Sequence, residues 1–174
     1  MIHLVIDVQK ALTEDEGLYN AEGFIENVST LIGKAREKDV EVIYVQHDAG
    51  EGSGFSVCDE DFEIDPRVAP AQGEKIYIKK INSCFGNKDF AAYMEKQEDK
   101  RLMITGLQTD FCIDATVKSA FEKGYDVIVP EGANSTFDNS CMDGATTCRY
   151  FNEEIWPNCF AECVGMDEAL AMLG

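Results

Sequence analysis

Hydrophobic positions along the chain alternate between short continuous runs and helical spacing. The runs fall at residues 4–6, 40–45, 76–78, 102–104, 125–129 and 160–164. Between them, apolar residues recur every three or four positions, at 24–35, 90–98, 113–121, 145–154 and 167–173. Continuous runs of Val and Ile are typical of strands that are buried on both faces, and the alternation with helices indicates parallel pairing. The pattern predicts a three-layer, Rossmann-like α/β fold with a mostly parallel sheet and helices on both faces.

The predicted elements follow one another without a linker, an internal repeat or a low-complexity tract. The segment 48–72 is rich in Gly and acidic residues and predicts an irregular loop, while Gly124 and Pro130 mark the ends of a helix and a strand. We therefore expect one domain over residues 1–174.

The composition is that of a folded domain, and its charge disfavours two classes of binding partner. The 174 residues are 45% hydrophobic and 28% charged, with a formal net charge of −18. An acidic surface repels phosphates and anionic lipids, so we expect neither nucleic-acid nor membrane binding. The segment Met1–Asp7 lacks the basic region of a signal peptide, and no apolar run approaches the length of a membrane span. A cytoplasmic chain with reduced thiols is the expectation.

Polar side chains follow each predicted strand. Asp7 and Gln9 follow the first strand, His47 the second, Lys79 the third, and Cys112 lies seven residues after Thr105 at the end of the fourth. Because ligands of open α/β sheets bind beyond the carboxyl ends of the strands, these side chains are candidates for one site.

Cys112 is the candidate nucleophile. We expect Thr109 to cap the following helix, which places Cys112 in the first turn, where the helix dipole and Lys79 would favour a thiolate. Asp7 could receive the thiol proton and return it to a leaving amine. Taken singly, each residue has a plainer explanation: a buried thiol, a turn carboxylate and a solvated lysine.

Other residues leave alternatives open. His47 could line a substrate pocket together with Gln9, Phe85 and Trp156, or be an ordinary loop histidine, and the two aromatic residues could belong to the core. Four of the seven cysteines, at positions 141, 148, 159 and 163, have no zinc-type spacing. We expect no metal and no cofactor.

Six segments of the chain carry a family resemblance: Leu4–Gln9, Val42–His47, Lys79–Phe85, Thr105–Thr116, Ala120–Asp126 and Ser135–Asp138. They resemble the isochorismatase-like cysteine hydrolases, and the segment Gln108–Asp138 resembles the streptothricin-hydrolase-type branch most. The resemblance implies a six-stranded parallel sheet and an Asp–Lys–Cys triad of Asp7, Lys79 and Cys112, with Lys79 preferred over Lys80 because it lies four residues before Ser83.

The same resemblance implies a cis peptide bond between Leu107 and Gln108 and an oxyanion hole formed by the backbone N–H groups of Gln108 and Cys112. It also implies assembly into dimers or larger oligomers. Only His47 stands where the nicotinamidase branch has its metal-binding Asp-x-His, which disfavours a zinc-dependent nicotinamidase. True isochorismatases lack the cysteine, so hydrolysis of an amide or related C–N bond in a small molecule is favoured.

An isochorismatase- or nicotinamidase-type activity stays an alternative within the family, and two other classes of function remain open from the sequence. One is a non-catalytic small-molecule binding protein on the same fold, and the other is a thiol redox protein that uses Cys84 and Cys112.

Overall fold

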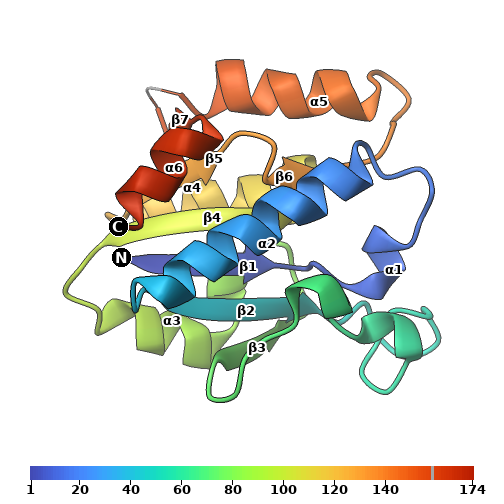
Figure 1. The fold of residues 1–174 in the computed structure, drawn as a ribbon. Coiled ribbons are helices and arrows are strands. Elements are labelled where there is room, and N and C mark those ends of the chain that lie inside the picture. The colour runs from blue at the N-terminus through green and yellow to red at the C-terminus, as the bar shows by residue number, and fades with distance from the viewer. Residues whose placement is uncertain (158) are drawn as a thin grey trace.

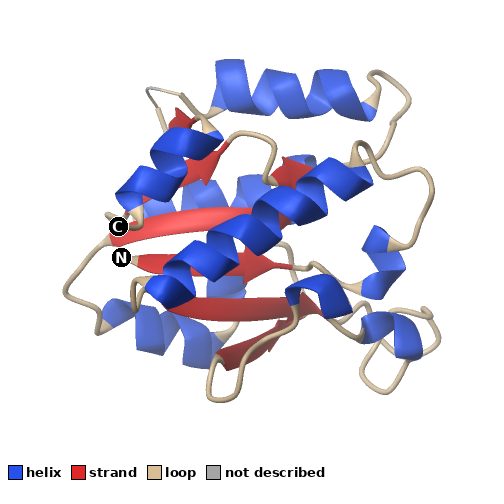
Figure 2. Cartoon of the chain, in the orientation of Figure 1, coloured by secondary structure: helices blue, strands red, loops and turns tan. Residues whose placement is uncertain are grey.

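The computed structural model describes residues 1–157 and 159–174, and a parallel sheet runs through its centre (Figures 1 and 2). Six strands follow the order β3-β2-β1-β4-β5-β7, and the two-residue strand β6 pairs beside them with the end of β4, all in parallel. The predicted parallel six-stranded sheet is thus confirmed. The strands are β1 (Ile2–Ile6), β2 (Glu41–His47), β3 (Lys75–Lys79), β4 (Arg101–Leu107), β5 (Asp126–Pro130), β6 (Asn134–Ser135) and β7 (Glu162–Val164).

Helices cover both faces of this sheet, as Figure 1 shows with α2 and α6 in front of the strands and α3 and α4 behind them. Each face has its own buried cluster, one including Phe24, Leu31 and Ala169 and the other including Phe90, Val117 and Trp156. The helices are α1 (Lys10–Thr13), α2 (Ala21–Glu37), α3 (Lys88–Glu95), α4 (Asp114–Glu122), α5 (Gly144–Tyr150) and α6 (Met166–Met172). None of the helices in the described ranges is both long and apolar enough to cross a membrane.

The strand order places a topological switch point between β1 and β4. The chain adds β2 and β3 on one side of β1, and β5 and β7 on the far side of β4. A crevice therefore opens beyond the carboxyl ends of these two central strands, where the connections diverge. Asp7 follows β1 directly, and Cys112 lies in the turn Thr109–Ile113 just after β4.

Close backbone approach between the two central strands requires a glycine at position 106. Gly106 pairs with Ile6 and has a φ of +129°, and a Cβ atom there would lie 1.9 Å from the carbonyl oxygen of Ile6. Any side chain would force β1 and β4 apart. The residue thus sets the spacing of the two strands that position Asp7 and Cys112.

Two short elements were not predicted from the sequence. Helix α1 is a single turn, and β6 is only two residues long. Neither is long enough to show a hydrophobic period, which is the signal that revealed the other elements.

His3 gives the fold a specific dependence on pH. Its ring is fully buried in β1, and Nε2 lies 3.0 Å from Oγ1 of Thr105 on β4. Burial lowers the pKa of His3 to about 3, so the folded chain keeps the ring neutral. The unfolded chain takes up a proton near the ordinary pKa of 6.5, which favours unfolding as the pH falls below that value.

We expect His3 to remove about 2 kcal/mol from the free energy of unfolding between roughly pH 7 and pH 5. Urea unfolding of the native chain and of His3→Gln at both pH values measures this contribution. The native chain should lose about 2 kcal/mol more than the variant, and equal losses would contradict the assignment.

Candidate active site

Asp7 is held at the end of β1 by an unusual backbone conformation. Its φ is +53°, and its N–H donates to the carbonyl of Val45 on the neighbouring strand at 2.8 Å. The carboxylate is 1% exposed, and Oδ1 has no hydrogen-bond partner among the described residues. Asp7 therefore presents one free carboxylate oxygen inside the protein.

Lys79 and His47 come from adjacent strands in register. Lys79 ends β3, and it pairs with His47 at the end of β2. The Lys79 side chain is fully buried and reaches past β2 toward β1. Parallel pairing thus brings the ammonium group to the Asp7 carboxylate over 72 positions of sequence.

Cys112 lies in the first turn after β4, as predicted, but the start of this helix differs from the prediction. A π-helical turn, Thr109–Ile113, precedes α4, and Gln108 stands at the cap position without a capping side-chain bond. The prediction that Thr109 caps the helix is wrong, because its hydroxyl instead donates to Oδ1 of Asn134 at 2.8 Å. The adjacent Asp110 accepts a bond from Thr136 at 2.6 Å, so two side chains fix this turn to the β6 region.

The Lys79 ammonium joins the other three side chains. Its Nζ lies 2.7 Å from Oδ2 of Asp7, 3.0 Å from Sγ of Cys112 and 3.1 Å from Nδ1 of His47. One polar atom each from Asp7, His47 and Cys112 lies within 4.8 Å of the other two. The structure therefore groups the three predicted triad residues and adds His47 to them.

The resting thiol is not activated in the way that its helix position predicted. Burial raises the pKa of Cys112 to about 12, and the Asp7 carboxylate adds to this effect while Lys79 opposes it. This shift opposes the thiolate expected from the helix position, because loss of water around sulfur disfavours its charged form. At neutral pH the raised pKa favours the neutral thiol of Cys112.

The other charges of the cluster follow from burial and mutual attraction. Burial raises the pKa of Asp7, and the nearby Lys79 ammonium offsets only part of this shift. Burial disfavours the Lys79 ammonium, but attraction to the Asp7 carboxylate outweighs this cost and keeps the pKa of Lys79 above its ordinary value. Burial and Lys79 together lower the pKa of His47. A cationic lysine, a basic carboxylate and a neutral imidazole thus surround a thiol.

Gln9 has a structural position rather than an open one. Its side-chain oxygen accepts from the N–H of His47 at 2.7 Å, and its nitrogen donates to the carbonyls of His47 and Phe62 at 3.2 and 2.8 Å. The side chain is fully buried. Gln9 therefore ties the ends of β1 and β2 to the turn Glu60–Phe62, and the predicted substrate contact has no support in its geometry.

Two aromatic residues predicted to line the pocket lie elsewhere. Trp156 is fully buried in the core on the α4 side of the sheet, and its indole N–H donates to Asp114 at 3.0 Å. Phe85 is half-buried, packs against Phe90 and Tyr125, and lines a hollow beside α3. Trp156 is thus a core residue, and Phe85 packs against the edge of the same core.

The aromatic residue next to the cluster comes from the irregular loop. Phe55 lies with its ring centroid 5.9 Å from that of His47. Asp48 anchors this loop by accepting hydrogen bonds from the Ser56 hydroxyl and from the N–H of Gly50. Sequence patterns do not reveal this contact, since the segment has no hydrophobic period.

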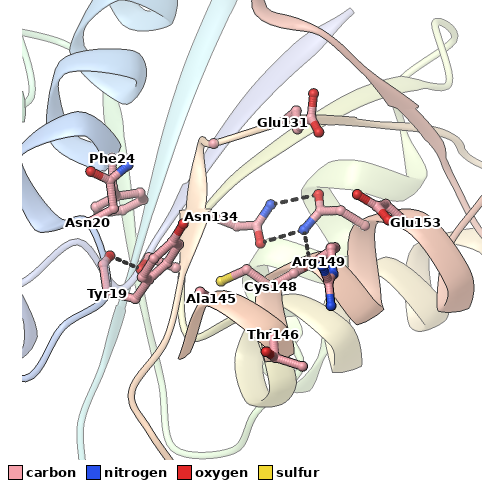
Figure 3. A pocket seen from close by; sticks show the side chains of 13 residues that line it. Tyr19, Asn20, Phe24, Glu131, Asn134, Ala145, Thr146, Cys148, Arg149 and Glu153 are labelled. Carbon is pink, nitrogen blue, oxygen red and sulfur yellow. Dashed lines mark hydrogen bonds between the residues drawn. The ribbon is translucent and has the colours of Figure 1, made fainter. Parts of the chain in front are cut away.

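A hollow of about 400 Å³ lies beside the start of the turn that carries Cys112 (Figure 3). Asn134 and Asn152 form a reciprocal pair of amide hydrogen bonds in its wall, each 3.0 Å long. Asn134 also accepts the bond from Thr109, so this wall is connected to the turn that carries Cys112. Tyr19 and Phe24 line one side of this hollow, and the α5 residues Cys148 and Arg149 line another.

One backbone feature implied by the family resemblance is present just before the turn that carries Cys112. The peptide bond between Leu107 and Gln108 is cis. The N–H groups of Ile113 and Phe111 both donate to the Gln108 carbonyl at 3.1 Å, which holds the turn against the end of β4. The oxyanion hole of Gln108 and Cys112 stays a prediction.

Comparison with known proteins decides the family. The family model described as the isochorismatase domain matches residues 1–153. The chain belongs to the isochorismatase family. Its relatives include the isochorismatase family protein YrdC of Bacillus subtilis, 32% identical over 136 residues that cover 77% of this chain and 73% of YrdC. An isochorismatase-family crystal structure from Chromobacterium violaceum superposes with a TM-score of 0.90 at 23% identity, covering 99% of this chain and 93% of that one.

Relatives with a named activity include a secreted isochorismatase effector of Verticillium dahliae, 26% identical over 154 residues, as well as a hydrolase and an amidase. Streptothricin hydrolase of Streptomyces noursei is 26% identical over 136 residues, covering 78% of this chain and 49% of its own length. N-carbamoylsarcosine amidase of Arthrobacter sp. is 27% identical over 146 residues, covering 72% of this chain and 55% of the amidase. Because identities to these branches are similar, they support the family and leave the streptothricin-hydrolase-type branch as a prediction.

The raised pKa of Cys112 predicts slow alkylation of the free protein. Since the thiolate is the reacting species, iodoacetamide at about pH 8 should modify the exposed Cys58 and Cys141 at least roughly tenfold faster than Cys112. The Cys112 rate should still be rising at about pH 10. Peptide-resolved mass spectrometry measures each site.

The same labelling in urea provides the control, because unfolding removes the burial that protects the thiol. All three cysteines should then react at similar rates. Preferential labelling of Cys112 in the folded protein near neutral pH would contradict the neutral-thiol assignment.

Proposed function

We propose that this protein hydrolyses an amide or related C–N bond of a small molecule through a thioester on Cys112. The supporting observation is the buried Lys79 ammonium, which contacts both the Cys112 sulfur and the Asp7 carboxylate. A nucleophile, a base and a fixed positive charge are the groups that acyl transfer requires. Family relatives named as amidases and amidohydrolases have the matching chemistry.

Asp7 is the proposed base. In the resting protein, Cys112 keeps its proton, so the proton must leave as sulfur attacks the substrate carbonyl. The unpartnered Oδ1 of Asp7 is available to receive it, and the raised pKa of this carboxyl strengthens it as a base. The same proton then passes to the nitrogen of the leaving amine.

Lys79 is proposed to stabilise negative charge as it develops on sulfur. Its ammonium already lies 3.0 Å from Sγ, so no rearrangement is needed when the thiolate forms. The N–H groups of Gln108 and Cys112 are the proposed donors to the carbonyl oxygen of the tetrahedral intermediate. Asp7 then activates water, which attacks the thioester, releases the acid product and restores the thiol.

His47 and Phe55 are the proposed substrate-facing residues on the β2 side. His47 stays neutral because its pKa is lowered, and its ring is only half-buried. Phe55 extends this side with an apolar ring. Together they favour an uncharged substrate group next to the scissile carbonyl, since both surfaces lack formal charge.

The test is a panel of small amides, ureido compounds and carbamoyl compounds, assayed for ammonia or amine release, followed by mutation of the nucleophile. For any compound that is turned over, Cys112→Ala should lower kcat by roughly 1,000-fold or more, because the covalent route is lost. Steady-state kinetics of the purified chain measures the effect.

Cys84→Ala is the matched control. Cys84 is also buried, and it accepts a hydrogen bond from Thr116 rather than from the Lys79 cluster. This variant should retain activity, which also separates hydrolysis from a dithiol redox reaction of Cys84 and Cys112. Full activity of Cys112→Ala would overturn the proposed mechanism.

A further inference from the structure

Three of the side chains around the Lys79 ammonium are metal ligands by type. A carboxylate oxygen of Asp7, Nδ1 of His47 and Sγ of Cys112 lie 2.7, 3.1 and 3.0 Å from Nζ of Lys79. One ligand atom from each of these side chains lies within 4.8 Å of the other two. Carboxylate, imidazole and thiolate are the ligands that zinc takes in proteins, with a water molecule as the fourth.

We infer that Asp7, His47 and Cys112 form a latent binding site for a thiophilic divalent cation such as Zn²⁺, and that the Lys79 ammonium occupies the place of that ion. The inference stands on the arrangement of these atoms and does not depend on the proposed hydrolysis. It assigns Lys79 a second task, which is to keep metal ions away from the thiol.

The size of the cluster suits this exchange of one cation for another. Zinc binds oxygen and nitrogen at about 2.0–2.2 Å and sulfur at about 2.3 Å. An ion at the position of Nζ would therefore need each ligand atom to move inward by roughly 0.5–1 Å. Removal of the lysine side chain leaves room for this movement and for the water ligand.

The second carboxylate oxygen of Asp7 could also bind a cation. Oδ1 of Asp7 is buried and lacks a hydrogen-bond partner among the residues described, while Oδ2 is bonded to Lys79. The adjacent Lys80 is no substitute for Lys79, because it is 74% exposed and pairs with Asp48 on the surface. Loss of Lys79 would leave a buried carboxylate without its ion-pair partner, which a metal ion would supply.

Binding would convert the thiol into a metal thiolate without any redox change. The Cys112 S–H bond breaks, a Zn–S bond forms, and the proton is released to solvent. In the native chain the ammonium opposes this reaction, because two cations would share one small buried site. The native protein should therefore be insensitive to zinc at this cluster.

The test compares the native chain with Lys79→Ala and Lys79→Thr, the second of which suits a strand position. Cobalt titration followed by thiolate-to-metal absorption, together with zinc calorimetry, reports binding without any need for a substrate. Each variant should bind one ion per chain, and the native chain should show no Cys112-dependent absorption. The other cysteines of the chain make a sulfur-specific control essential.

Lys79→Ala/Cys112→Ser is that control, and Lys80→Ala is the control for loss of a neighbouring lysine. Zinc should bind Lys79→Ala roughly 100-fold or more tightly than the double variant, since loss even of an outer-shell partner costs a metal site about 10–100-fold. Lys80→Ala should behave like the native chain. A variant that folds only with zinc also supports the inference.

The inference would be overturned if the folded variants bind no metal, or bind it equally well without Cys112. A Lys79 variant that fails to fold in both the absence and the presence of zinc would also count against it. Cys112-dependent binding of zinc by the native chain, with affinity similar to that of Lys79→Ala, would show that the ammonium does not exclude metal.

Discussion

The site depends on one buried positive charge. Lys79 is removed from water, and its ammonium is bonded to Asp7, His47 and Cys112. Burying an unpaired ammonium costs several kcal/mol, so the lysine requires the carboxylate as much as the carboxylate requires the lysine. Because the three partners come from β1, β2 and the turn after β4, this single group connects the strand ends on both sides of the switch point.

The backbone geometry of the sheet alone places these residues next to one another. Parallel register places His47 beside Lys79 and sets Ile6 against both Val45 and Gly106. The missing side chain at Gly106 lets β1 and β4 approach closely. Bonds from Thr109 and Thr136 then orient the turn that carries Cys112. A fold shared by proteins of low sequence identity thus supplies a fixed set of anchor points, and the side chains at those points determine the chemistry.

Much of the fold could be predicted because strands buried on both faces appear as continuous apolar runs. The grouping of Asp7, Lys79 and Cys112 could be predicted for the same reason, since each follows such a run. The protonation state of Cys112 could not be predicted, because its pKa depends on how completely the surrounding protein excludes water. The positions of Gln9 and Trp156 could not be predicted either. An amide or an indole next to a strand end gives the same sequence pattern whether the side chain faces a cavity or the core.

The proposed hydrolysis requires a covalent bond between the substrate acyl group and Cys112. Rapid quenching of turnover with an amide substrate, followed by peptide mass spectrometry, detects this bond. We expect an acyl group on the peptide that contains Cys112, formed in step with release of one equivalent of amine. Turnover that leaves Cys112 unmodified, or an acyl group found on another cysteine, would contradict it.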